Sequence, residues 1–237
     1  MKNLKNWDKK TWLSSPKYIS NIINFLEKRI KFNKEIKILD IGCGRGKIIS
    51  TLAKKHQIKN LPLGIDIVGH KDVAKKIRFT KINALKYLEK TKENFDLILF
   101  KQSIHFFKIT EIKKILYFSK KKLYPKGKII IMSLEPKKNN WPLFKVFKSR
   151  LIKSLKKDEV ILNLIKSNFK KYKVNYFRFK IKISRDLYLQ MIKNRFTSCL
   201  LSLSNNDLKN GSKEIKKKYQ KKLIFFDNLI CISYKKK

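Results

Sequence analysis

Three closely spaced glycines at the end of a short apolar run are the most constraining feature of this 237-residue chain. The segment reads Ile38-Leu39-Asp40-Ile41-Gly42-Cys43-Gly44-Arg45-Gly46, and residues 47–56 follow it with apolar side chains at helical spacing. A strand, a sharp glycine turn and a helix in this order bring free backbone N–H groups and a helix N-terminus towards a ligand. The segment therefore predicts an α/β fold with a nucleotide-like ligand at the turn.

The rest of the chain continues this alternation of strands and helices. Apolar patterning predicts seven strands, at residues 36–41, 61–67, 77–82, 95–100, 128–134, 172–183 and 223–234. It predicts helices at residues 16–30, 47–56, 71–76, 84–91, 109–123, 141–155, 158–169, 187–196 and 206–221. Because several strands are apolar throughout, we expect parallel strands covered by helices on both faces.

No linker rich in Gly, Ser or Pro divides the chain, so we expect a single domain. Residues 1–35 would form an N-terminal helical lid and residues 36–135 the ligand-binding core. Residues 136–237 would supply a substrate cap and the last strands.

An acidic residue after the next predicted strand identifies the kind of ligand more closely. Asp66 ends Leu63-Gly64-Ile65-Asp66 and lies 20 residues after Gly46, where a carboxylate that binds ribose hydroxyls is expected. The glycines are spaced by two and two, whereas the dinucleotide fingerprint has two and three. This spacing favours an adenosine-containing ligand other than NAD.

These segments resemble the class I S-adenosylmethionine-dependent methyltransferases over about residues 36–135. The resemblance extends to Phe95-Asp96-Leu97-Ile98 and Pro125-Lys126-Gly127-Lys128. It implies a Rossmann-like, doubly wound, mostly parallel seven-stranded sheet with an antiparallel last strand and a helical cap insertion.

The resemblance also implies roles for individual residues. The residues expected to bind S-adenosylmethionine are Asp40, Gly42, Gly44, Gly46, Asp66, Asn83, Ala84 and Gln102. Asp40 and the glycines would hold the methionine part, Asp66 the ribose, and Asn83-Ala84 the adenine. Many family members carry Asp at the position of Asn83, although an amide oxygen also accepts a hydrogen bond.

The loop after the fourth core strand reads Lys101-Gln102-Ser103-Ile104-His105-Phe106-Phe107. It lacks the Asn/Asp-Pro-Pro-aromatic signature of amino methylases of nucleic acids, the nucleophilic Cys of cytosine-C5 enzymes and the Asp of ribose 2′-O enzymes. It is similar to the small-molecule type 11 branch, which includes the trans-aconitate methyltransferases. In that interpretation His105 is the candidate base, and Trp12, Tyr18, His105 and Arg195 are candidate substrate contacts.

The composition limits the other functions of the chain. Three scattered cysteines without a CxxC spacing favour neither a disulfide framework nor a zinc site, and no metal is expected. The chain has no apolar run of membrane-spanning length and no secretory signal, so a cytoplasmic protein without a membrane partner is expected.

The net charge of +43 has two explanations. A partner that carries phosphates is one, and a lysine-rich coding bias is the other; the lysines are spread over all predicted elements, which favours the bias. Three functions follow from the sequence: methylation of a small molecule, methylation of RNA or protein at a basic surface, and cofactor binding without catalysis. The first is favoured.

Overall fold

The computed structural model describes residues 11–237, so the first ten residues of the expected lid lie outside the description. Seven strands form one sheet in the order β3-β2-β1-β4-β5-β7-β6. The strands are β1 (Ile38–Ile41), β2 (Leu63–Asp66), β3 (Arg78–Lys81), β4 (Phe95–Lys101), β5 (Leu123–Leu134), β6 (Lys173–Ser184) and β7 (Lys222–Lys235). Only β7 runs antiparallel to its neighbours, β5 and β6, and the other adjacent pairs are parallel. The predicted fold class is confirmed.

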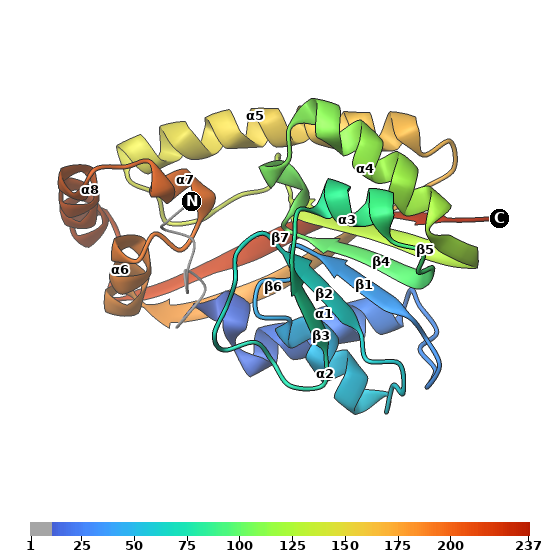
Figure 1. Ribbon diagram of the computed structural model, residues 1–237. Helices are drawn as coiled ribbons and strands as arrows, with labels where there is room; N and C mark the ends of the chain where they lie inside the picture. Colours follow the sequence, from blue (N-terminus) through green and yellow to red (C-terminus); the bar gives the residue numbers. More distant parts are fainter. Residues whose placement is uncertain (1–10) are drawn as a thin grey trace.

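Helices cover both faces of this sheet, as apolar strands require (Figure 1). The helices are α1 (Pro16–Glu27), α2 (Lys47–Lys55), α3 (Ala84–Lys90), α4 (Ile109–Lys121), α5 (Lys145–Asn168), α6 (Arg185–Lys193), α7 (Ser198–Leu201) and α8 (Asn205–Lys218). Helices α1 and α2 lie on one face, and α3, α4 and α5 lie on the other. The buried side chains accordingly form two apolar clusters. In residues 11–237, no helix has the length and apolar character that a membrane span requires.

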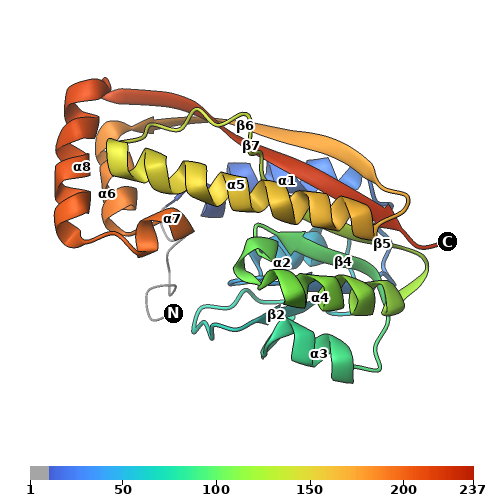
Figure 2. The same ribbon diagram turned by 90° about the horizontal axis from the view of Figure 1, so that it is seen from above.

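The long strands β6 and β7 extend beyond the core and carry a helical cap of α6, α7 and α8 (Figure 2). Helix α5 runs from this cap back along the core, so it contacts both parts of the molecule. The cap thus approaches the core at the end of the sheet where the glycine turn lies.

Three sequence-based expectations for individual elements were wrong. Residues 71–76 form no helix, because Arg45 and Ser50 bind the backbone there: Ala74 N–H donates to the Arg45 carbonyl at 2.9 Å and the Ser50 hydroxyl donates to the Lys75 carbonyl at 2.6 Å. The helices expected at 141–155 and 158–169 are the single helix α5. Strand β5 begins at Leu123 and continues through Pro125 and Gly127, where its pairing with β4 shifts register.

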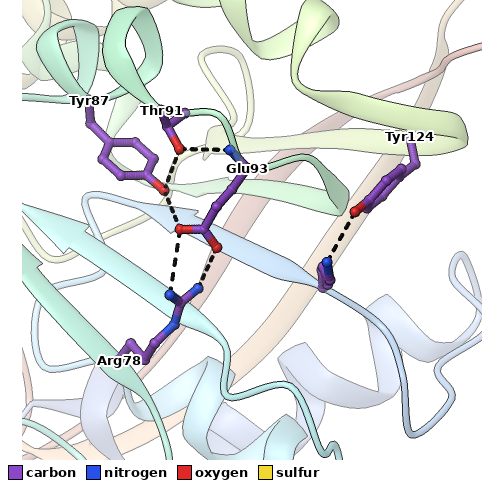
Figure 3. A network of polar contacts seen from close by, with 6 residues as sticks. Arg78, Tyr87, Thr91, Glu93 and Tyr124 are labelled. Atoms are coloured by element: carbon purple, nitrogen blue, oxygen red, sulfur yellow. Dashed lines mark hydrogen bonds and ion pairs between the residues drawn. The ribbon is translucent and has the colours of Figure 1, made fainter.

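The end of the sheet opposite the glycine turn is held by a polar network (Figure 3). Arg78, at the start of β3, donates to both carboxylate oxygens of Glu93, at 3.5 and 2.7 Å. The Tyr87 hydroxyl reaches the same carboxylate at 3.4 Å, and the Thr91 hydroxyl accepts the Glu93 N–H at 3.1 Å. Because a bidentate pair is geometrically specific, this network fixes the edge strand β3 against the segment that precedes β4.

Replacing Gly211, which lies in α8, is expected to destabilise the fold. A Cβ at this position would lie 2.4–2.5 Å from ring carbons of Phe144, which is only 1% exposed. We expect Gly211→Ala to lower the free energy of unfolding by about 1–3 kcal/mol in urea titrations, although alanine normally stabilises a helix. The exposed neighbour Asn210 provides the control, since Asn210→Ala should be neutral or slightly stabilising. Equal effects of the two substitutions would contradict this packing argument.

Candidate functional site

The glycine turn is held between two neighbouring strands by its backbone. The N–H groups of Gly42 and Cys43 donate to the Ile65 carbonyl of β2, at 2.8 and 3.2 Å. On the other side, the Ser103 hydroxyl that follows β4 donates to the Ile41 carbonyl at 2.5 Å. The carboxyl ends of β1, β2 and β4 therefore meet at one place, where open α/β sheets bind ligands.

The three glycines of the turn have positive φ angles but different surroundings. A Cβ on Gly42 would lie 2.4 Å from the Ser103 Cβ, and one on Gly46 would lie 2.2 Å from the Ile77 Cδ1. A Cβ on Gly44 would meet no protein atom within 4 Å. Close packing thus requires glycine at Gly42. At Gly46 the contact is with the flexible end of Ile77, and Gly44 faces open space beside the helix N-terminus.

Asp66 is bound to this turn through its carboxylate. Its Oδ2 accepts the Gly44 N–H at 2.8 Å and its Oδ1 accepts the Val68 N–H at 2.9 Å. Each oxygen keeps a further lone pair, so the carboxylate still has capacity for hydroxyl donors. After β3, the next strand along, Asn83 caps α3 by accepting the Lys86 N–H at 3.1 Å, and Ala84, the first residue of α3, is buried.

Asp40 is buried beneath the turn, with 3% of its surface exposed. Its Oδ1 accepts no hydrogen bond from any residue between 11 and 237. Burial, and then the negative charge of Asp66, raises the pKa of the Asp40 carboxyl from 3.8 to about 7, while Lys101 acts in the opposite direction. This carboxyl is therefore a proton-binding group near neutral pH.

A narrow cavity of about 60 Å³ opens beside the end of β4. Gln102, His105 and Phe106 form its wall on the core side, and side chains of α5 and the α6–α7 segment close it on the cap side. Gln102 has a φ of 54°, a strained conformation for a residue with a side chain, and its N–H donates to the Met132 carbonyl at 2.7 Å. Its side-chain oxygen accepts a hydrogen bond from the Lys101 ammonium at 2.6 Å.

His105 is neutral at physiological pH in this cavity. Burial, and then the nearby charge of Lys157, lowers the pKa of its imidazole to about 4. Its ring lies 4.2 Å from the ring of Phe106, centroid to centroid. A neutral imidazole next to the cavity can accept a hydrogen bond, and it brings no positive charge to the site.

Asp158 is a cavity residue that the sequence did not reveal. It lies in the middle of α5 and lines the cavity together with Leu151 and Ser154 of the same helix face. It was expected at the first position of a separate helix, where an aspartate is an ordinary solvent-exposed residue. In the continuous helix it is only 6% exposed, and burial raises its pKa to about 6.

The remaining candidate residues are held in packed surroundings. Trp12 is 6% exposed and packs edge-on against Trp141, Phe196 and Phe225. Tyr18 is fully buried, and its hydroxyl donates to Asp227 Oδ2 at 2.7 Å. Neither of the two residues lines the cavity.

Arg195 does line the cavity. Its Nη2 donates to the Leu203 carbonyl at 3.0 Å and to Asn205 Oδ1 at 2.9 Å. These two bonds hold the guanidinium against the segment that leads into α8. The described part of the chain holds no group of three His, Cys, Asp or Glu side chains arranged to bind a metal ion.

Comparison with known proteins agrees with this geometry. Residues 39–131 match the family described as "Methyltransferase domain". No curated protein matches the sequence. Among solved structures, a putative methyltransferase from an antibiotic biosynthesis pathway of Anabaena variabilis superposes with a TM-score of 0.66 at 16% identity, over 91% of this chain and 96% of that one.

Two further structures show the same fold. A SAM-dependent methyltransferase from Archaeoglobus fulgidus has a TM-score of 0.54 at 18% identity, over 92% of this chain and 94% of the other. One from Geobacter sulfurreducens, in complex with S-adenosyl-L-homocysteine, has a TM-score of 0.55 at 12% identity, over 98% and 97% of the two chains. At these identities the likeness establishes the fold.

The buried Asp40 carboxyl predicts a pH-dependent change in stability. Because the Asp40 pKa is higher in the folded than in the unfolded protein, ionisation of this carboxyl destabilises the fold. This destabilisation is absent below about pH 4 and complete above about pH 7. We therefore expect Asp40→Asn to raise the thermal midpoint relative to the unchanged protein at pH 8, and the gain to shrink towards pH 4. The exposed carboxylate of Glu89 provides the control, because Glu89→Gln should leave the midpoint unchanged at both pH values. A gain that is independent of pH would contradict the assignment.

Proposed function

We propose that this chain, an S-adenosylmethionine-dependent methyltransferase, transfers the methyl group to a small-molecule acceptor held in the cavity beside β4. The single observation that carries the proposal is the position of this cavity. Gln102 in the cavity wall is followed by Ser103. The Ser103 hydroxyl donates a hydrogen bond to the carbonyl of Ile41, the last residue before the glycine turn. A donor bound at the turn and an acceptor bound in the cavity would thus share the loop after β4.

The donor side of the site fits S-adenosylmethionine by its open space and its hydrogen-bonding groups. Gly44 leaves room where a side chain would intrude, and the carboxylate of Asp66 beside it has lone pairs for two ribose hydroxyls. We assign the adenine end to Asn83 and Ala84, and the methionine end to Asp40, Gly42 and Gly46. The side-chain oxygen of Asn83 already accepts the Lys86 N–H at the start of α3. Its remaining lone pair would accept a hydrogen bond from the adenine amine.

When bound, S-adenosylmethionine supplies a methyl group that is already activated on a sulfonium. The task of the protein is therefore to align the acceptor atom and to exclude water. Gln102 is held rigidly by its backbone and side-chain bonds, so it defines the boundary between the two halves of the site. His105 is neutral and can accept a hydrogen bond from the acceptor.

The other candidate residues act through packing in this proposal. Trp12 and Tyr18 hold the N-terminal helix against β7 and the cap, and they position the cavity wall without entering it. Arg195 forms part of the wall, and its bonds to Leu203 and Asn205 orient it. The cavity admits the reacting group of a small molecule, and its narrowness favours such an acceptor over the surface of a folded RNA or protein.

Two substitutions in the glycine turn should separate cofactor binding from folding. We expect Gly44→Ala to weaken S-adenosylmethionine binding at least about tenfold in calorimetry, because its Cβ fills the open space. Its cost in stability should be only about 1–2 kcal/mol, which is the strain of a side chain at positive φ. Gly42→Ala should destabilise the fold more, since its Cβ would meet Ser103. Unchanged affinity in Gly44→Ala would refute the assignment of this space to the cofactor.

A labelled-methyl screen of cell-extract fractions tests the class of acceptor. We expect label from S-adenosylmethionine to enter the fraction of small metabolites, and to enter it less in Asp66→Ala. Incorporation into RNA, together with tight binding that weakens steeply with salt, would favour the basic surface as the acceptor site. Binding of S-adenosylmethionine without incorporation into any fraction would indicate a non-catalytic cofactor-binding protein.

A further inference from the structure

We infer that the acceptor is a small amine, bound as an ammonium ion by the Asp158 carboxylate and the exposed Phe106 ring of the same cavity. This inference rests on the proposed function and names the chemical class of its substrate. It stands on the position of Asp158 in α5, on the lining of the cavity and on the charges around it.

The Asp158 carboxylate is a buried anion without a direct hydrogen-bond or ion-pair partner in the described part of the chain. Its residue is 6% exposed, and within residues 11–237 no hydrogen bond or ion pair joins its carboxyl to another residue; the charge of Lys157 acts on it only at longer range. Burying a carboxylate without a partner is costly, and an apolar residue on this helix face would avoid that cost. A ligand cation is the partner that such a group lacks.

The other walls of the cavity also suit an ammonium ion. Three aromatic side chains form part of its wall: Phe106 from the loop after β4, which is 46% exposed, and the buried rings of Trp141 before α5 and Phe196 after α6, so Phe106 offers the accessible face. Aromatic faces attract alkylammonium groups through their quadrupoles, whereas a neutral hydroxyl gains little from them. A carboxylate in the same cavity as an accessible aromatic face therefore selects amines over alcohols of the same shape.

Titratable and charged groups from every surrounding element bear on this site. Lys157 precedes Asp158 on α5 and favours its ionised form. Burial raises the pKa of the Cys199 thiol of α7, and the Asp158 charge adds a smaller effect in the same direction. Across the cavity, His105 is neutral; Arg195 is a second cation of the wall, and its guanidinium is directed to the neutral acceptors of Leu203 and Asn205. Burial raises the pKa of Asp158 to about 6, so the carboxylate is ionised at neutral pH and an ammonium ion finds its charge partner there.

The Asp158 carboxylate can also accept the proton that an ammonium ion must lose before its nitrogen is methylated. The bound ammonium ion gives one proton to Asp158, which later passes it to solvent. The free amine lone pair then forms the new N–C bond while the methyl–sulfur bond breaks, and that electron pair stays on sulfur as S-adenosylhomocysteine is released. The product keeps one positive charge on nitrogen, so charge and atoms balance.

Three probes of similar size test the head-group preference: benzylamine, benzyl alcohol and benzoate. Their binding to the full chain is measured by ligand-observed NMR titration in saturating S-adenosylhomocysteine. We expect benzylamine to bind at least about tenfold more tightly than benzyl alcohol, because hydrogen bonds to a charged group are the stronger kind. Asp158→Asn should remove this preference. Glu159→Gln, on the exposed side of the same helix, makes the same change in charge and should preserve it.

A second set of measurements separates this inference from the proposed function. Calorimetry should show unchanged S-adenosylmethionine affinity in Asp158→Asn, and thermal melting at pH 8 should show that the variant is folded. Labelled products from the extract screen should be retained by a cation exchanger at neutral pH.

Equal binding of benzylamine and benzyl alcohol, or no binding of benzylamine, would overturn the amine assignment. Labelled neutral or anionic small molecules would also overturn it, while leaving the proposed function intact. Failure of the unsubstituted protein to bind S-adenosylmethionine would instead refute the proposed function.

Discussion

The site depends on the backbone bonds that clamp the glycine turn between β2 and β4. The Ile65 carbonyl receives the N–H groups of Gly42 and Cys43, and the Ser103 hydroxyl reaches the Ile41 carbonyl from the opposite side. These bonds require the chain to pass so closely that a Cβ on Gly42 would overlap the side chain of Ser103. Asp66 and Gln102 are thereby fixed on either side of one turn, and parallel strands on a rigid sheet hold them there.

Buried carboxyls are concentrated near this end of the molecule, and they are compensated to different degrees. Burial raises the pKa of the Asp227 carboxyl, and the charge of Lys101 and a hydrogen bond from Tyr18 offset part of this rise. The Lys101 ammonium lies 4.9 Å from the centre of the Tyr18 ring. Asp40 and Asp158 are compensated less by their surroundings. Groups of this kind reduce stability, and they persist where a function requires them. The strained φ angle of Gln102 lies in the same region.

The cavity exists because two parts of the sequence that lie far apart meet across it. Helix α5 carries Asp158 and spans both the core and the cap, as Figure 2 shows. Strands β6 and β7 carry α6, α7 and α8 outward, and the α6–α7 segment returns towards the loop after β4. The donor region comes from the first half of the chain and most of the acceptor region from the second. Substitutions that change the acceptor region can therefore leave the donor region unchanged.

The sequence by itself determined the parallel core, the glycine turn and the acidic residue that follows the next strand. These features depend on local patterns: apolar runs, glycine spacing and a fixed offset along the chain. The tertiary structure decided that α5 is continuous and that residues 71–76 form a loop. It also decided that Gly42 is packed against Ser103 whereas Gly44 faces open space. It also decided which polar residues are buried. A solvent-exposed aspartate at a helix start and a buried aspartate in a cavity look identical in sequence, and only packing against distant segments distinguishes Asp158 as the latter.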